Sequence, residues 1–303
     1  MLTAINLFAQ KKGLQAIDSL KTILIHSAAD TQRVNVLNLL GWEYMNLGDF
    51  VTAKKYVNKS IQLSAYLDYS KGEAYAYKLF GDVCSNKGEF SNANRYFFTA
   101  LNLSKRRNDK TAIADYYQSI AWMQYALGDY DDTLSNCQQG LSISKEIGDN
   151  LSVSVCFSIK ALALCNQGKY QESINNHFDA IKYALNSNDT NAVSVCYNNL
   201  ALAYSAQGNY PEAIRYYYKA MKIYEANNEK TPIPYTLMNI GDVYFEQENF
   251  TEALNKYNEA WEKLRALNQK NGMANCFIGL GNIYVALGNY TVAKKTILKK
   301  PLI

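Results

Sequence analysis

The side chains that most often carry out chemistry in proteins are few in this sequence and lie far apart. The two histidines, His26 and His177, have no cluster of cysteines or carboxylates around them that could complete a metal site. His177 shares its position in a repeated pattern with Phe97, Tyr217 and Tyr257, so we expect it in the core. No phosphate-binding loop, nucleophile motif or GxGxxG before a helix is present. The sequence therefore predicts no catalytic residue, no cofactor and no metal, and we expect a protein that is not an enzyme.

The six cysteines are scattered singly, and no pair has CxxC spacing. Cys156, Cys196 and Cys276 share one position of the repeated pattern, which places them at equivalent points of different helices. Packed helices lie about 8–10 Å apart, whereas a disulfide needs Cα atoms within about 7 Å of each other. We therefore expect buried free thiols, which fits a reducing compartment.

Charge and hydropathy exclude two classes of partner. The net charge is only +4 over 303 residues, and the strongest basic run, Lys105 to Arg107, falls at a predicted helix end. Nucleic-acid binding would need a concentrated basic face. No apolar run approaches the ~20 residues of a membrane helix, and Met1–Gln10 lacks the features of a signal peptide. We expect a cytoplasmic protein with no membrane span in this chain and no nucleic-acid partner.

Nearly every side chain belongs to a copy of one repeated segment, seen most clearly in Asn191–Lys230. This segment has an amphipathic run, a Gly-Asn-Tyr-Pro turn, a second amphipathic run and a polar break. The same pattern returns at a constant spacing in both directions along the chain. Each copy therefore predicts a hairpin of two antiparallel helices, and Tyr216, Tyr217 and Tyr218 must then include both core and solvent-facing rings.

Two positions of the repeat have the residue types that a hairpin requires. Small residues in the first helix allow close approach of its partner, and they are Gly41, Gly81, Ala121, Ala161, Ala201, Gly241 and Gly281. The turn glycines, which end a helix in the left-handed conformation, are Gly48, Gly88, Gly128, Gly168, Gly208 and Gly288. Glu248 replaces this glycine in one copy, so we expect a strained or altered turn there.

Polar segments between the hairpins predict the limits of the repeats. We expect a single array over residues 1–303, with repeats near residues 31–70, 71–110, 111–150, 151–190, 191–230, 231–270 and 271–303. The last copy is incomplete, and its second helix should run from about Thr291 and end by Pro301. We expect residues 1–30 to form a degenerate capping hairpin, because Leu2–Ala9 and Leu14–Ile25 are both apolar at helical spacing.

Helix starts are indicated at several of these breaks. Ser70 followed by Glu73 has the spacing of a capping box. Thr231 precedes Pro232, which suits a cap before a first-turn proline, and Pro211 suits the first turn of a second helix.

A small residue at Gly41, an aromatic at Tyr44, Ala53, a large residue at Val57 and Ser60 follow the tetratricopeptide repeat pattern. The chain resembles this family over nearly its whole length. It departs from the pattern in its period, which is longer than the usual one, and in the missing final proline of each unit, and both departures imply longer helices. Versions with this longer period resemble those of bacterial Rap-type peptide-sensing regulators, kinesin light chain and Pins-type adaptors. The resemblance implies an all-α solenoid of stacked antiparallel hairpins in a right-handed superhelix.

The resemblance also implies that first-helix residues not needed for hairpin packing line a concave groove for a partner. The candidates are Asn38, Trp42, Lys78, Asp82, Gln118, Trp122, Asn198, Asn199, Leu202, Asn239 and Asp242. The tryptophans could anchor an apolar segment or pack on the next repeat, and the amides could bind an extended backbone or reflect the abundance of asparagine. The basic pattern that some family members use for a C-terminal carboxylate is not reproduced, because Asp82 follows Lys78.

These features predict a non-catalytic scaffold that binds a protein or peptide segment. A second hypothesis is the sensory portion of a bacterial signalling protein, such as a histidine kinase or transcription regulator, because the chain stops inside an unfinished hairpin at Lys299–Ile303. A third is an architectural role with self-association through the uncapped C-terminal end.

Overall fold

The computed structural model describes residues 13–297, and these residues contain helices and no strands. The helices of the first part are α2 (Leu14–His26), α3 (Thr31–Asn46), α4 (Phe50–Tyr66), α5 (Ser70–Asn86), α6 (Phe90–Arg106), α7 (Lys110–Leu127) and α8 (Tyr130–Glu146). Those of the second part are α9 (Asn150–Asn166), α10 (Tyr170–Asn186), α11 (Thr190–Ala206), α12 (Tyr210–Ala226), α13 (Pro232–Glu246), α14 (Phe250–Ala266), α15 (Lys270–Ala286) and α16 (Tyr290–Ile297). The predicted all-α solenoid of stacked antiparallel hairpins is confirmed.

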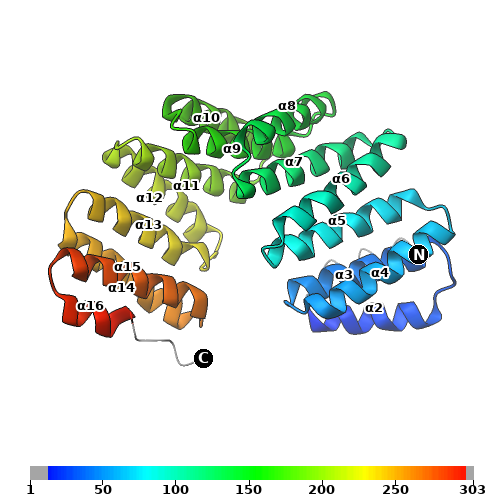
Figure 1. Cartoon of the computed structure of the whole chain (residues 1–303), viewed down its shortest axis with the longest axis horizontal. Helices are drawn as coiled ribbons and strands as arrows, with labels where there is room; N and C mark the ends of the chain where they lie inside the picture. Colours follow the sequence, from blue (N-terminus) through cyan, green and yellow to red (C-terminus); the bar gives the residue numbers. More distant parts are fainter. Residues whose placement is uncertain (1–12, 298–303) are drawn as a thin grey trace. The chain divides into compact units, whose positions relative to one another are not determined.

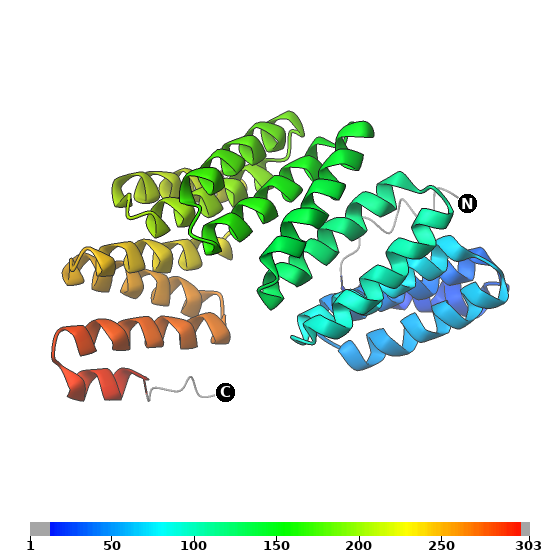
Figure 2. The same cartoon turned by 45° about the horizontal axis from the view of Figure 1, so that its top comes forward.

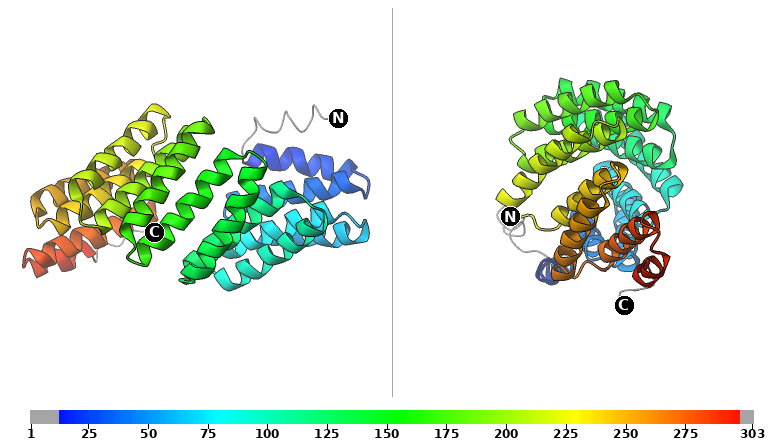
Figure 3. Two further views of the ribbon diagram at one scale, coloured as in Figure 1. Left: turned by 90° about the horizontal axis from the view of Figure 1, so that it is seen from above. Right: turned by 90° about the vertical axis from the view of Figure 1, so that its left-hand side faces the viewer.

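The chain divides into two compact units, and the boundary falls between Ser152 and Val153 near the start of α9. We call these unit 1 and unit 2. In unit 1, α3 packs against α4, and α5 against α6, as antiparallel pairs (Figure 1). In unit 2, the same pairing joins α13 to α14 and α15 to α16, which Figure 2 shows for the orange and red helices. Helix α2 packs against α3 (Figure 3), so among the described residues of unit 1 an additional helix precedes the first hairpin.

The turn inside each hairpin ends the first helix with a left-handed residue. Gly208 has φ 84°, its N–H donates to the Ser205 carbonyl at 2.9 Å, and the Asn209 N–H donates to the Tyr204 carbonyl at 2.9 Å. This pair of bonds is the Schellman motif, which satisfies carbonyls at a helix end. Glu248 adopts the same conformation with φ 58°, so the strained turn expected at this non-glycine residue is confirmed.

The turns between hairpins use the same left-handed conformation, which the polar composition of these breaks did not predict. The left-handed residues of these turns are Asp68, Asn108, Gly148, Asn188, Asn228 and Asn268. Asparagine and aspartate tolerate positive φ better than other non-glycine residues. Both kinds of turn are therefore short and rigid, and this keeps the repeat period constant along the chain.

Close packing inside each hairpin depends on the small residues of the first helix. A Cβ atom at Gly241 would lie 2.7 Å from Cδ2 of Tyr257, and one at Gly81 would lie 2.5 Å from Cε1 of Phe97. Ala201 is completely buried. The expectation that small residues let the two helices approach closely is confirmed.

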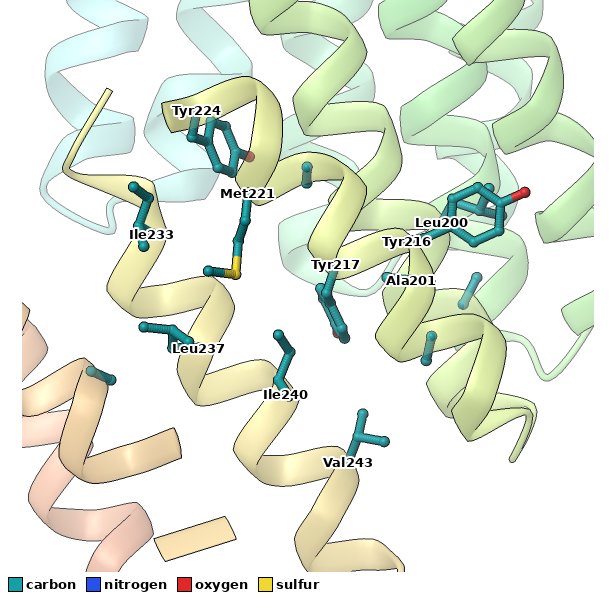
Figure 4. Close-up of a cluster of buried hydrophobic side chains, with 14 of the residues drawn as sticks. Leu200, Ala201, Tyr216, Tyr217, Met221, Tyr224, Ile233, Leu237, Ile240 and Val243 are labelled. Atoms are coloured by element: carbon teal, nitrogen blue, oxygen red, sulfur yellow. The ribbon is translucent and has the colours of Figure 1, made fainter. Parts of the chain in front are cut away.

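The core of each unit continues from one hairpin into the next. In unit 2, Met221 and Tyr224 of α12 face Ile233 and Leu237 of α13 (Figure 4), and Leu237 is completely buried.

The three consecutive tyrosines of α12 separate as expected. Tyr216 and Tyr217 are buried, whereas the ring of Tyr218 is exposed. Helical geometry, which spreads neighbouring side chains around the axis, therefore decides their roles.

Helix caps differ from two of the sequence predictions. The capping box at Ser70 and Glu73 is wrong, because α5 begins at Ser70 itself after Tyr69, and no side chain caps it. The left-handed turn at Asp68 sets this helix start without a side-chain cap. Thr231 also makes no capping hydrogen bond, although Pro232 lies in the first turn of α13 as expected.

Two expectations concern the ends of the chain. Helix α2 matches the predicted Leu14–Ile25, whereas the predicted Leu2–Ala9 lies outside the described residues. Helix α16 begins at Tyr290, one residue before the expected start, and the predicted end by Pro301 lies outside them as well. Within residues 13–297, no helix combines the length and the apolar character needed to cross a membrane.

Candidate functional site

The predicted site residues lie mainly on one face of the first helix of each hairpin. Positions 35, 38 and 42 are three and four residues apart, so they share a face of α3, and the same holds in the later repeats. We call this surface the first-helix face of each unit. In unit 1 it consists of Asn35, Asn38, Trp42, Tyr75, Lys78, Asp82, Asp115, Gln118 and Trp122. In unit 2 the corresponding residues of α9, α11 and α13 are Val155, Ser158, Leu162, Val195, Asn198, Leu202, Tyr235, Met238 and Asp242.

The two tryptophans of unit 1 remain accessible. Trp42 on α3 is 42% exposed and Trp122 on α7 is 45% exposed. Trp122 lies against Tyr125 near the end of the same helix, with ring centroids 5.5 Å apart. Because packing within the described chain covers only about half of each residue, both rings retain surface that a partner could cover.

Lys78 on α5 is already paired with a carboxylate of its own helix. Its Nζ lies 3.2 Å from Oδ2 of Asp82, one turn away. Burial disfavours the charged lysine, but the carboxylates of Asp82 and Asp115 outweigh it and raise the pKa of Lys78. Burial also raises the pKa of Asp82, against the influence of Lys78. Lys78 is therefore a poor partner for an incoming carboxylate.

The side-chain amides of unit 1 differ in which of their atoms form hydrogen bonds within the described chain. Asn38 is 2% exposed, and its Nδ2 donates to the Gly72 carbonyl of the next hairpin at 3.1 Å. Its Oδ1 has no hydrogen-bond partner within residues 13–297. Gln118 is half-buried, and its Nε2 also lacks a partner in that part of the chain. Buried unpaired amide atoms are costly, so these two atoms lower the stability of unit 1.

The predicted residues of unit 2 are half-buried or exposed. Asn198 and Asn199 are half-buried, and Asn198 Oδ1 accepts a hydrogen bond from Thr236 Oγ1 at 3.4 Å. Leu202 is exposed. The remaining two are Asn239, which is half-buried, and Asp242, whose carboxylate accepts a hydrogen bond from the Tyr257 hydroxyl.

A cavity of about 640 Å³ opens on unit 1, and only one of its lining residues was predicted. That residue is Asn38. The other lining residues are Asn35, Tyr69, Lys71, Gly72, Ala74, Tyr75, Ser104, Asp109, Thr111, Ala112, Asp115, Tyr116, Asp149 and Ser152. Asp115 could have been found from sequence, since it lies one helical turn before Gln118 and two before Trp122. We call this feature the unit 1 cavity.

The isolated histidine of α10 is a core residue, as expected. His177 is completely buried, and neither ring nitrogen has a hydrogen-bond partner within the described residues. Burial lowers the pKa of His177 to about 3, so the ring is neutral at physiological pH.

The cysteines are free, and all except the half-buried Cys165 are buried. Burial raises the pKa of Cys276 to about 12, and that of Cys196 rises for the same reason. A thiol held in its protonated form is a weak nucleophile, so the predicted free thiols are confirmed as packing residues. The described residues contain no group of three or more His, Cys, Asp or Glu side chains that could hold a metal ion.

Comparison with known families agrees with this architecture. Family models described as "Tetratricopeptide repeat" match residues 34–66, 157–226 and 233–296, which together make up more than half of the chain. The chain belongs to the tetratricopeptide repeat family. A sequence search of the curated proteins finds no match.

Several solved structures resemble most of the chain. A Signal Transduction ATPase with Numerous Domains protein with a tetratricopeptide repeat sensor, from Pyrococcus horikoshii, superposes with a TM-score of 0.69 at 17% identity. The match covers 93% of this chain but only 43% of that protein. A Rap protein complexed with Competence and Sporulation Factor gives a TM-score of 0.60 at 14% identity, covering 92% of this chain and 94% of that one. The quorum sensor NprR from B. thuringiensis gives 0.61 at 12% identity, covering 93% and 90%. At these identities the likeness establishes the fold.

Proposed function

We propose that this protein binds peptide or protein segments on the first-helix faces of its units and performs no catalysis. The observation that carries this proposal is the half-exposed pair Trp42 and Trp122, which occupy the same position of the repeat in unit 1. Large aromatic rings that retain exposed surface are frequent energetic anchors in interfaces.

Unit 2 offers a first-helix face of different chemistry. Val155, Val195 and Leu202 are exposed, and Asn198 lies between the last two along α11. Apolar side chains beside an amide suit an extended segment, because the amide can bond its backbone while the apolar groups cover its side chains. The proposed surface also includes three further residues of α11 and α13, which are Asn199, Asn239 and Asp242.

Two solved structures support a binding role by analogy of fold. One contains a Rap protein complexed with Competence and Sporulation Factor, and the other is the apo form of the quorum sensor NprR. The same arrangement of helices therefore holds a bound factor in one protein and belongs to a sensor in the other. Both uses agree with the proposed binding role.

A selection from a phage-displayed library of random heptapeptides tests the proposal. We expect the wild-type chain to enrich a consensus, and Trp42→Ala together with Trp122→Ala to weaken binding of the enriched peptides by about 30-fold or more. Phe98→Ala is the matched control, because Phe98 is an exposed aromatic residue on a second helix, α6. Equal binding by the wild type and the double variant would remove the tryptophans from the site, and failure of the wild type to enrich any peptide would overturn the proposal.

A second candidate role is the sensor portion of a signalling protein. The likeness to the Pyrococcus horikoshii protein favours it, because nearly all of this chain matches less than half of a protein with a tetratricopeptide repeat sensor. Sequencing the native transcript tests this role. An effector domain in the same reading frame would support it, and an open reading frame limited to the repeats would contradict it.

A further inference from the structure

The second helices α4 and α6 of unit 1 carry basic side chains and no acidic ones. Neither helix contains an aspartate or a glutamate between its first and last residue. The exposed cations are Lys55 and Lys59 on α4 and Arg95, Lys105 and Arg106 on α6. We call these five residues the unit 1 basic surface. All of them belong to one compact unit, so the surface is complete within it.

The two helices that carry this surface are neighbours. They are the second helices of successive hairpins, and α5 packs against both of them (Figure 1). Nζ of Lys54 on α4 lies 3.9 Å from Oε2 of Glu89, the residue directly before α6. Lys55 and Arg95 hold the same position of the repeat one residue further along. Their charges therefore lie side by side on adjacent helices.

The charge of this surface is not compensated by the described part of the chain. Among residues 13–297, none of its five cations forms an ion pair with a carboxylate. The second helices of unit 2 differ in this respect. Arg215 on α12 pairs with Glu212, and Lys256 on α14 pairs with Glu259. Grouped cations without carboxylates repel one another, so a bound polyanion would remove an unfavourable electrostatic energy.

Tyrosine rings restrict several of these cations without neutralising them. Three cationic groups lie within 6 Å of a ring centre, in the pairs Arg95 with Tyr96 at 5.5 Å, Lys59 with Tyr56 at 5.9 Å and Lys105 with Tyr117 at 5.0 Å. A cation over a ring face keeps its full charge. Because its side chain is already partly ordered, it loses less conformational freedom when a ligand binds.

The length of the surface fits a short run of acidic residues. Arg95 and Arg106 are three turns apart, which is about 16 Å along α6. Side chains on one side of an extended segment recur about every 7 Å. A segment of about six extended residues therefore spans the surface and can place a carboxylate near each of its ends.

The width of the surface favours a protein segment over a larger polyanion. The next second helix, α8, begins with the exposed residues Asp131 and Asp132, so the basic surface ends after two helices. Two helices are about 20 Å wide. A membrane or a long nucleic acid would extend beyond this width over the carboxylates of α8, whereas a single peptide segment can stay on the cations.

We propose that the unit 1 basic surface binds an acidic segment of a partner protein, in which aspartates and glutamates form a run of about six residues. The carboxylates of this segment pair with Lys55, Lys59 and Arg95 at one end of the surface and with Lys105 and Arg106 at the other. The surface lies on second helices, so it is separate from the first-helix faces and does not depend on their function.

Fluorescence anisotropy with a fluorescein-labelled octaglutamate peptide tests this inference. We expect the wild type to bind the peptide, and binding to weaken by about fivefold or more when the salt concentration rises from about 50 mM to about 200 mM. Lys55→Glu together with Arg95→Glu should weaken binding by about tenfold or more, because repulsion replaces attraction at two adjacent positions.

Lys182→Glu together with Lys222→Glu is the matched control. Both lysines are exposed on second helices of unit 2, α10 and α12, and their reversal changes the net charge by the same amount. This control should bind octaglutamate as the wild type does. Equal weakening by the two double variants would assign the effect to net charge and overturn the proposed surface.

Several further outcomes decide between the proposal and its alternatives. No binding of octaglutamate by the wild type, or equal binding of an octaglutamine peptide, would overturn the proposal. Trp42→Ala with Trp122→Ala should bind octaglutamate normally, and a loss there would move the peptide to the first-helix face. Circular dichroism during thermal unfolding checks that the Lys55 and Arg95 variant is folded, and Lys55→Gln with Arg95→Gln, with an expected loss of about threefold, replaces it if it is not.

Two other polyanions test the class of partner in parallel titrations. Single-stranded octathymidylate has a charge close to that of octaglutamate, and its tighter binding would overturn the assignment to an acidic protein segment. Vesicles that contain phosphatidylserine test a membrane surface. Sedimentation of the wild type with these vesicles, abolished by Lys55→Glu with Arg95→Glu, would overturn the assignment as well. Weaker binding of both polyanions than of octaglutamate supports it.

Discussion

Side chains that share a position in the repeat do not always share an environment. Phe97, Tyr217 and Tyr257 fill the large position of their hairpins with rings that suit a core, and His177 fills it with a ring that carries two unmet nitrogens. A buried nitrogen without a hydrogen-bond partner lowers the free energy of unfolding, because folding removes it from water and gives it no hydrogen bond in return. His177 is therefore a residue of the described chain at which a simple substitution should increase stability.

We predict that His177→Phe raises the free energy of unfolding by about 1–2 kcal/mol at pH 7, because it removes two buried unpaired nitrogens. In the wild type, the unfolded histidine gains a proton below about pH 6.5, whereas the folded one does so only near pH 3. Stability should consequently fall as the pH is lowered through this window, by about 2 kcal/mol at pH 5. Urea unfolding at a series of pH values measures both effects.

His26→Gln is the control for this pH dependence, since His26 is exposed at the end of α2. It should leave the dependence unchanged, whereas His177→Phe should reduce it between pH 6.5 and pH 3. A phenylalanine variant with the same pH profile as the wild type would contradict the assignment of the effect to His177.

Among the helices, left-handed turns mark the ends of most, and several helices also have a side-chain N-cap. Residues with positive φ occur at regular places in both kinds of turn, and glycine, asparagine or aspartate fill nearly all of them. Glu248 is the exception, and it adopts φ 58° because the hydrogen bonds of the surrounding Schellman motif require it. The turn geometry therefore prevails over the preference of the individual residue.

Glu248→Gly should stabilise the chain by about 0.5–1 kcal/mol, because glycine adopts this left-handed conformation without strain. The larger backbone entropy of glycine in the unfolded chain offsets only part of this gain. The midpoint of urea unfolding measures the change. Gly208→Glu is the reciprocal variant, since Gly208 has φ 84° in the same turn of another repeat, and it should destabilise by a similar amount. A Glu248→Gly variant no more stable than the wild type would show that the turn stores no strain.

On the scale of the whole chain, there are two compact units that divide at Ser152, and within each unit neighbouring hairpins pack on one another. Stability in such an array is a sum of local contributions from repeats and from the interfaces between adjacent repeats. A core side chain truncated in one unit should therefore destabilise that unit and leave the other unit protected from hydrogen exchange.

We predict that Leu237→Ala, in the core of unit 2, costs about 2–5 kcal/mol locally and accelerates hydrogen exchange in α12, α13 and α14. Leu40→Ala should do the same for α3 and its neighbours in unit 1. Both leucines are completely buried, so the two variants are matched controls for each other. Exchange that accelerates equally in both units for either variant would show that the array unfolds as one cooperative body.

Much of the fold could be predicted from sequence because its determinants are local. The repeat period, the small positions and the turn glycines each act within one hairpin, so Gly81 against Phe97 or Gly208 in its turn needed no knowledge of distant contacts. The capping box at Ser70 was wrong because the left-handed turn at Asp68 sets the helix start.

The hairpins, the family and the face on which Trp42 and Trp122 lie all follow from the residue pattern, because helical periodicity alone places residues on a common face. Which of those residues stay available follows only from the folded chain. The Gly72 carbonyl of the next hairpin accepts a hydrogen bond from the Asn38 amide, Asp82 forms an ion pair with Lys78, and residues of three successive repeats line the unit 1 cavity. Most of these outcomes depend on contacts between repeats, and a pattern that describes one repeat at a time contains no information about them.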